Sequence, residues 1–96
     1  MNIVVAYDVN TETREGRRRL RKVAKACEGF GQRVQYSVFE CSLADTDFER
    51  FRRKLVGLID TDEDSLRIYT LRGRREEVVR VWGRDGYVDF RAPLVV

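Results

Sequence analysis

The 96-residue sequence contains no histidine, and this absence excludes several classes of function. Without histidine there is no Ser-His-Asp or Cys-His nucleophile, no histidine general base and no histidine-rich zinc site. If the protein is a hydrolase, its chemistry must therefore depend on carboxylates, together with a hard metal ion.

Cysteines and long apolar runs are also scarce. Cys27 and Cys41 fall in no CxxC or other zinc-binding spacing, so we expect two buried thiols in a reducing cytoplasm. No apolar run reaches 18 residues, and Met1 leads directly into a short strand-like run. We therefore expect neither a membrane span nor a signal peptide. The length predicts a single domain over residues 1–96.

Positive charge is abundant, and almost all of it comes from arginine, with 16 arginines against 3 lysines. Residues 11–35 carry eight basic and three acidic side chains, whereas residues 40–64 carry four basic and eight acidic ones. Arginine binds phosphate as a planar fork, so this distribution indicates a surface for a polyanion. The alternative is an ordinary solvated helix face.

Hydrophobic periodicity divides the chain into short elements. It predicts strands at 3–7, 32–36, 38–43, 65–71 and 78–82, and helices at 15–28 and 46–59. The first strand is expected to be buried on both faces, and the second and third to be joined very tightly. Asp45 and Thr46 are expected to cap the second helix. The acidic run 60–64 is expected to be a solvated linker.

The resulting order β-α-β-β-α-β-β predicts an α+β fold: a ferredoxin-like split βαβ unit with one added C-terminal strand. Two helices would cover one face of an antiparallel sheet. The other face, free and partly apolar, would need a cover such as a second subunit. We expect a core over about residues 1–72, and a C-terminal segment, about 77–96, that crosses to a partner chain.

Asp8 is the best-placed carboxylate, because it stands where the first strand ends and a loop begins. A carboxylate there is held rigidly and still meets solvent. The alternative is that Asp8 caps the following turn through its own side chain. One carboxylate is a poor metal site by itself, but two copies of Asp8 could meet in a two-fold dimer.

The first helix supplies a cluster of cations for phosphate contacts, and Arg33 could extend this patch across the sheet. The helix residues concerned are Arg14, Arg17, Arg18, Arg19 and Arg21. Phe39 follows in the next strand, where it belongs either to the core or a dimer interface, or to a base-stacking surface.

Four motifs, in order and with matching spacing, resemble the CRISPR-associated Cas-two family over essentially the whole chain. They are Val5-Ala6-Tyr7-Asp8-Val9, the helix run 19–25 (RLRKVAK), the strand run 31–41 (GQRVQYSVFEC) and the run 64–69 (DSLRIY). The resemblance implies a ferredoxin-like homodimer with facing sheets. It also implies metal-dependent cleavage of phosphodiester bonds in RNA or duplex DNA, during CRISPR spacer acquisition.

The resemblance also implies roles for individual residues. Asp8 matches the family's metal-associated residue, which would hold Mg²⁺ or Mn²⁺, and Tyr7 precedes it as a further catalytic position. The nucleic-acid contacts implied by the family are Arg17, Arg19, Arg33 and Phe39. The implied partners are a second copy of the chain, the Cas-one integrase, duplex DNA and single-stranded RNA. Two other functions remain open: a non-catalytic scaffold that bridges integrase dimers on duplex DNA, and a ferredoxin-like RNA-binding toxin.

Overall fold

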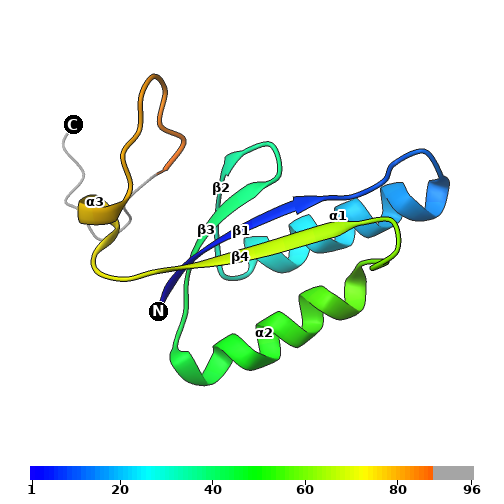
Figure 1. Cartoon of the computed structure of the whole chain (residues 1–96), viewed down its shortest axis with the longest axis horizontal. Helices are drawn as coiled ribbons and strands as arrows, with labels where there is room; N and C mark the ends of the chain where they lie inside the picture. The colour runs from blue at the N-terminus through cyan, green and yellow to red at the C-terminus, as the bar shows by residue number, and fades with distance from the viewer. Residues whose placement is uncertain (88–96) are drawn as a thin grey trace.

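The computed structural model describes residues 1–87, which form one antiparallel sheet with two long helices against it (Figure 1). The elements are β1 (Asn2–Asp8), α1 (Arg14–Glu28), β2 (Gly31–Gln35), β3 (Val38–Ser42), α2 (Asp45–Leu58), β4 (Ser65–Leu71) and the one-turn helix α3 (Arg75–Val78). No helix within residues 1–87 is long and apolar enough to cross a membrane.

The strand order in the sheet is β2-β3-β1-β4, so β1 is central and pairs antiparallel with both β3 and β4. Val5 lies opposite Phe39 on one side and Ile68 on the other. This order, with α1 after β1 and α2 after β3, is the ferredoxin-like arrangement, and the predicted α+β class is confirmed.

Both helices pack on the same face of the sheet, which we call the covered face. The fully buried side chains that join the sheet to the two helices are Ile3 and Val5 of β1, Phe39 of β3, Val23 and Cys27 of α1, and Phe51 and Leu55 of α2. Burial of their apolar area is the main stabilising contribution to the domain. Cys27 and Cys41 are free and buried, as expected, and burial raises the pKa of their thiols to about 12 and about 11.

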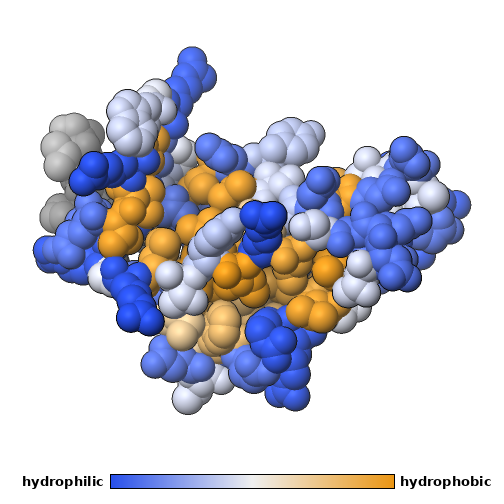
Figure 2. Space-filling model, in the orientation of Figure 1, coloured by the Kyte–Doolittle hydropathy of each residue, from blue (hydrophilic) through white to orange (hydrophobic). Residues whose placement is uncertain are grey.

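The first strand is not buried equally on both faces, contrary to the sequence-based expectation. Its residues alternate, because Ile3, Val5 and Tyr7 are buried under the helices whereas Val4 and Ala6 are only half-buried. The half-buried residues lie on the other side of the sheet, which we call the open face. Figure 2 shows hydrophobic residues gathered in the middle of the molecule and hydrophilic residues around them.

The two long helices differ in how their first turns are capped. Thr13 caps α1, since its Oγ1 accepts a hydrogen bond from the backbone N–H of Gly16 at 3.0 Å. The expected cap of α2 is wrong: the helix begins at Asp45, after Ala44, and no side chain caps it. The tight joint between β2 and β3 is confirmed, with only Tyr36 and Ser37 between the strands.

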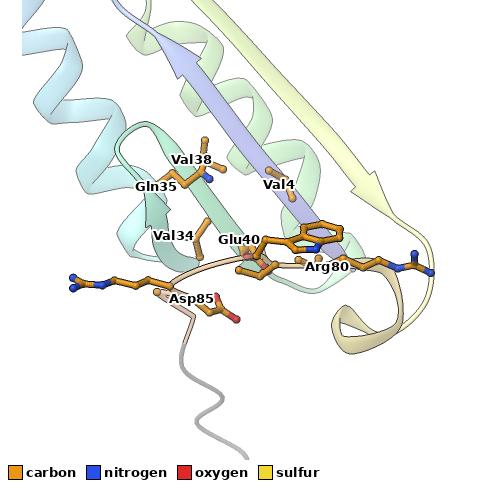
Figure 3. Close-up of a pocket in the computed structure, with 12 residues that line it drawn as sticks. Val4, Val34, Gln35, Val38, Glu40, Arg80 and Asp85 are labelled. Atoms are coloured by element: carbon orange, nitrogen blue, oxygen red, sulfur yellow. The ribbon is translucent and has the colours of Figure 1, made fainter.

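The strand expected at 78–82 does not form. α3 ends at Val78, and residues 79–87 have no regular structure. A strand needs a sheet edge for its backbone, but this segment lies across the open face, where Val79 and Val81 line a groove of about 380 Å³ with Val4 and Val38 (Figure 3). The β-branched residues therefore pack through their side chains alone. Of the segment 77–96, which is expected to cross to a partner, residues 88–96 lie outside the described residues.

Candidate active site at the end of the first strand

Asp8 ends β1 opposite Ser65, the first residue of β4, and its side chain is exposed. Its position in the strand gives it the parity of Val4 and Ala6, so it belongs to the open face. Within residues 1–87 no group donates a hydrogen bond to its carboxylate. The alternative that Asp8 caps the following turn is therefore wrong, and the carboxylate is available for a ligand.

The turn after Asp8 is capped by Asn10. The Oδ1 atom of Asn10 accepts a hydrogen bond from the backbone N–H of Glu12 at 2.9 Å, which is the usual geometry of an Asx turn. The carbonyl oxygen of Asn10 lies against Gly16 in α1, where a β-carbon would stand 1.8 Å from it. No side chain fits there, so glycine at position 16 allows the loop to lie directly on the helix.

Asp64 lies at the same end of the sheet, and its side chain is completely buried. One carboxylate oxygen accepts the N–H of Asn10 at 3.0 Å, and the other accepts the N–H of Asp60 at 2.8 Å. Arg19 donates from Nε at 2.8 Å and from Nη2 at 3.3 Å. The guanidinium of Arg19, together with these backbone donors, lowers the pKa of Asp64 below its ordinary value.

Asp64 was missed by sequence reasoning, which treated 60–64 as a solvated linker. Four of the five residues in this run are acidic, so composition alone does not distinguish the one that turns inward. The signal that could have found it is its position directly before β4, beside the end of β1. Arg19 is also placed differently from the expectation, because most of its guanidinium is occupied by Asp64 and Glu63.

Tyr7 and Phe39 lie on the covered face, opposite to Asp8. Phe39 is fully buried and stacks against Tyr7 with ring centroids 6.2 Å apart. The assignment of Phe39 to a nucleic-acid surface is therefore corrected: it is a core residue and no base can reach it. Burial raises the pKa of the Tyr7 phenol, while the nearby Arg33 guanidinium acts in the opposite direction.

Arg33 is half exposed at the edge of the covered face, with its guanidinium 5.3 Å from the ring centre of Phe39 and 4.0 Å from Glu28. The register pairs it with Phe39, so it does not share a face with Asp8 within one chain. Arg17 is nearer to the Asp8 loop, because its Nη1 donates to the carbonyl of Thr11 at 3.1 Å. Of the predicted cations, Arg17 and Arg19 thus contact the segments at the Asp8 end, whereas Arg33 lies on the covered face beside Phe39 and Tyr7.

The comparisons with known proteins agree with this architecture. The family model described as "CRISPR associated protein Cas2" matches residues 1–78. The chain belongs to the Cas2 family. It is 50% identical to the "CRISPR-associated endoribonuclease Cas2 1" of Moorella thermoacetica, and the match covers the whole of both chains. It is 44% identical to the "CRISPR-associated endonuclease Cas2" of Halalkalibacterium halodurans, with 99% of each chain covered.

A solved member of the family has the same fold. The crystal structure of Streptococcus pyogenes Cas2 at pH 6.5 superposes with a TM-score of 0.77 at 48% identity. The match covers 86% of this chain and 100% of that one. The motif-based assignment to the Cas2 family is therefore confirmed.

The acidic groups among residues 1–87 of this Cas2-family chain do not form a complete metal cage. Within residues 1–87 no three His, Cys, Asp or Glu side chains are grouped so that they could hold a metal ion. Asp8 offers one free carboxylate, whereas Asp64 already accepts four hydrogen bonds, from Asn10, Asp60 and Arg19. Mg²⁺ commonly binds through one or two carboxylates, with water and phosphate oxygens completing its shell. Asp8 fits such a site if substrate, or a second copy of the chain, supplies further oxygens.

Proposed function

We propose that this chain is a divalent-metal-dependent endonuclease of CRISPR spacer acquisition, which cleaves phosphodiester bonds in RNA or duplex DNA. The observation that carries the proposal is Asp8: an exposed carboxylate without a described partner, at the end of a central strand whose following loop is firmly held. The relatives named above as endoribonuclease and endonuclease support the same activity.

In this mechanism Asp8 would hold Mg²⁺ or Mn²⁺. When bound, the ion would supply positive charge against the phosphodiester and acidify water for attack. Tyr7 contributes by packing on Phe39, which fixes the strand just before Asp8.

The exposed surface of α1 would bind the phosphate backbone. Its cations form no ion pair with any of residues 1–87, so they are free to contact an anionic ligand; they are Arg14, Arg17, Arg18, Arg21, Lys22 and Lys25. Contacts of this kind are independent of sequence and sensitive to salt. Arg33 would contact phosphate from the far edge of the sheet.

The working unit in the proposal is a homodimer that packs through the open face. Tyr69 is 49% exposed, Val4 is half-buried beside it, and Val81 is 45% exposed, so apolar area remains uncovered on this side of one chain. A second copy would bury this area and bring a second Asp8 to the complex. The dimer would work in the cytoplasm with the Cas-one integrase as its partner.

A cleavage assay with labelled RNA and labelled duplex DNA, each with Mg²⁺, Mn²⁺ or a chelator, tests the activity. Asp8→Asn should lower kcat by more than about hundredfold, since losing even an outer-shell contact to a metal costs 10- to 100-fold. Asp62→Asn makes the same change at another exposed aspartate and should retain the activity. If Asp8→Asn kept full metal-dependent cleavage, the assignment would fail, and a binding scaffold would be left.

Light scattering in dilute solution tests the dimer. The expected mass is twice the 11.3 kDa of one chain. Val4→Asp on the open face should shift the protein toward the monomer, because it places a charge in the apolar contact. A wild-type mass near 11.3 kDa would contradict the dimer.

A further inference from the structure

The loop that follows Asp8 is fixed by a buried ion pair between two elements far apart in the sequence. Arg19 belongs to α1, and Asp64 precedes β4, 45 residues later. The side chain of Arg19 is 19% exposed and that of Asp64 is fully buried. A guanidinium in this position already uses Nε and Nη2 for Asp64, and Nη2 also lies 3.5 Å from Glu63.

Asp64 continues the pairing between β1 and β4 beyond the last strand residues. Asp8 lies opposite Ser65 in the ladder. Two residues after Asp8, the N–H of Asn10 donates to Oδ1 of Asp64, so a side-chain oxygen takes the place that a backbone carbonyl would have. The backbone before Asp8 is therefore held by β4, and the backbone after Asp8 is held by Asp64, the residue just before β4.

Asn10 is held at the same time from the other side. Its carbonyl lies against Gly16, and its own Oδ1 organises the turn to Glu12. Arg19 belongs to α1, the helix against which Asn10 packs. Because Arg19 binds the Asp64 carboxylate, it holds this acceptor of the Asn10 N–H in place relative to α1. Removing the guanidinium would leave Asp64 buried without its cation, which is costly, so Asp64 would turn toward water and release Asn10.

We propose that Arg19 and Asp64 are positioning residues that hold the Asp8 loop in its active geometry, and that Arg19 is not a phosphate ligand. The proposal rests on the proposed nuclease function of Asp8 for its catalytic consequence. Its structural part, that the pair fixes the loop, is independent of any activity.

The test compares wild type with Arg19→Gln and Asp64→Asn. Arg18→Gln, which makes the same charge change at an exposed neighbour on α1, is the control for the exchange measurement alone. Amide hydrogen exchange is measured at Asn10 and Asp60, with β3 amides as reference. Arg19→Gln and Asp64→Asn should speed exchange at these two amides by about tenfold or more, the factor expected for losing a charged hydrogen bond. Arg18→Gln should not.

Cleavage kinetics and nucleic-acid affinity give the second readout. Arg19→Gln and Asp64→Asn should each lower kcat with KM and affinity little changed, and the double variant should be no worse than either single one. A phosphate ligand would behave differently: Arg19→Gln would weaken binding, whereas Asp64→Asn, which frees the guanidinium, would not. The proposal is overturned if Arg19→Gln alone weakens binding and neither variant changes amide exchange. If wild type cleaves nothing, the proposed function fails, and the exchange data still decide whether the pair positions the loop.

Discussion

Two arginine–carboxylate pairs fasten the two ends of this molecule, and they differ in what surrounds the carboxylate. At the Asp8 end, Nε of Arg19 lies 2.8 Å from Oδ2 of Asp64. At the other end, Nε of Arg75 lies 2.7 Å from Oε1 of Glu40. The side chains of the two arginines are almost equally exposed, at 19% for Arg19 and 18% for Arg75. Asp64 also accepts hydrogen bonds from two backbone N–H groups, whereas the Glu40 carboxylate accepts two hydrogen bonds from the Arg75 guanidinium.

In the second pair it is the arginine, Arg75, that contacts several groups. Arg75 contacts Glu40, lies 3.2 Å from Asp85 and places its guanidinium 3.7 Å from the ring centre of Tyr87. It therefore ties the segment after β4 to the open face of β3, outside the core. The first pair lies at the edge of the core and holds the loop after Asp8, whereas the second attaches the segment after β4 to the outside of the sheet. We expect the first to contribute to global stability and the second to local order.

The largest effect should come from Asp64→Ala. The substitution leaves Arg19 with only Glu63 and leaves the N–H groups of Asn10 and Asp60 without their acceptor, so the free energy of unfolding should fall by about 3 kcal/mol. Urea denaturation measures the change. Asp62→Ala, an exposed neighbour in the same turn, should stay within about 0.5 kcal/mol of wild type. Equal losses of unfolding free energy in Asp64→Ala and Asp62→Ala would contradict the expected stabilising role of the Arg19–Asp64 pair.

Glu40→Ala should have a smaller global effect, of about 1 kcal/mol, because Arg75 keeps Asp85 and gains water. Its main consequence should be local. The segment that contains Arg80 and Arg84 should detach from the open face, and trypsin should cleave there faster than in wild type. Glu77→Ala, which removes an exposed carboxylate of α3, is the control. Unchanged cleavage after Glu40→Ala would show that the groove contacts alone hold the segment.

The pH dependence of stability gives a further test of the Arg19–Asp64 pair. The pKa of Asp64 is lowered in the folded protein, mainly by Arg19, from an ordinary value of 3.8. A lowered pKa means that the unfolded chain takes up the proton first, so this contribution is complete above about pH 4 and is lost as the pH falls through the lowered value. The stability difference between wild type and Asp64→Asn should therefore shrink below pH 4. A constant difference down to pH 2 would contradict the assignment.

The apolar core and the order of the elements could be predicted from the sequence. Apolar side chains at positions such as Val5, Val23, Phe51 and Leu55 follow strand or helix periodicity, and the core and the ferredoxin-like order follow from them. Asp8 was found because a strand end is visible as a change from apolar to polar residues. The predicted strand at 78–82 failed because β-branched residues show only that a segment is apolar, not whether a sheet edge is free to receive its backbone.

The site was harder to predict because it depends on which charged groups meet. Arg17 and Arg19 are indistinguishable in the sequence, and both lie in an arginine-rich run. Only the fold brings Asp64 to one of them across 45 residues. Phe39 was ambiguous for a related reason: its strand alternates, and a break between strands hides which parity faces the helices. Pairing across long sequence separations is a property of the fold, and local periodicity does not encode it.

The smallest effect on stability should come from Arg17→Gln, which completes the comparison among the arginines. Its side chain is exposed and donates only to the carbonyl of Thr11, so the free energy of unfolding should change by less than about 0.5 kcal/mol. Nucleic-acid binding should nevertheless weaken. If Arg17 neutralises one phosphate of duplex DNA, the slope of log affinity against log salt concentration should become shallower by about 0.9.

Fluorescence anisotropy with labelled duplex DNA at several salt concentrations measures this slope. Lys54→Gln, an exposed cation on α2, provides the matched control and should leave the slope unchanged if α1 alone contacts the phosphates. A slope altered equally by both variants would mean that the protein's overall charge governs binding. A slope altered by Arg17→Gln and not by Arg19→Gln would assign the two arginines to different tasks, because only the first guanidinium is free to meet a phosphate.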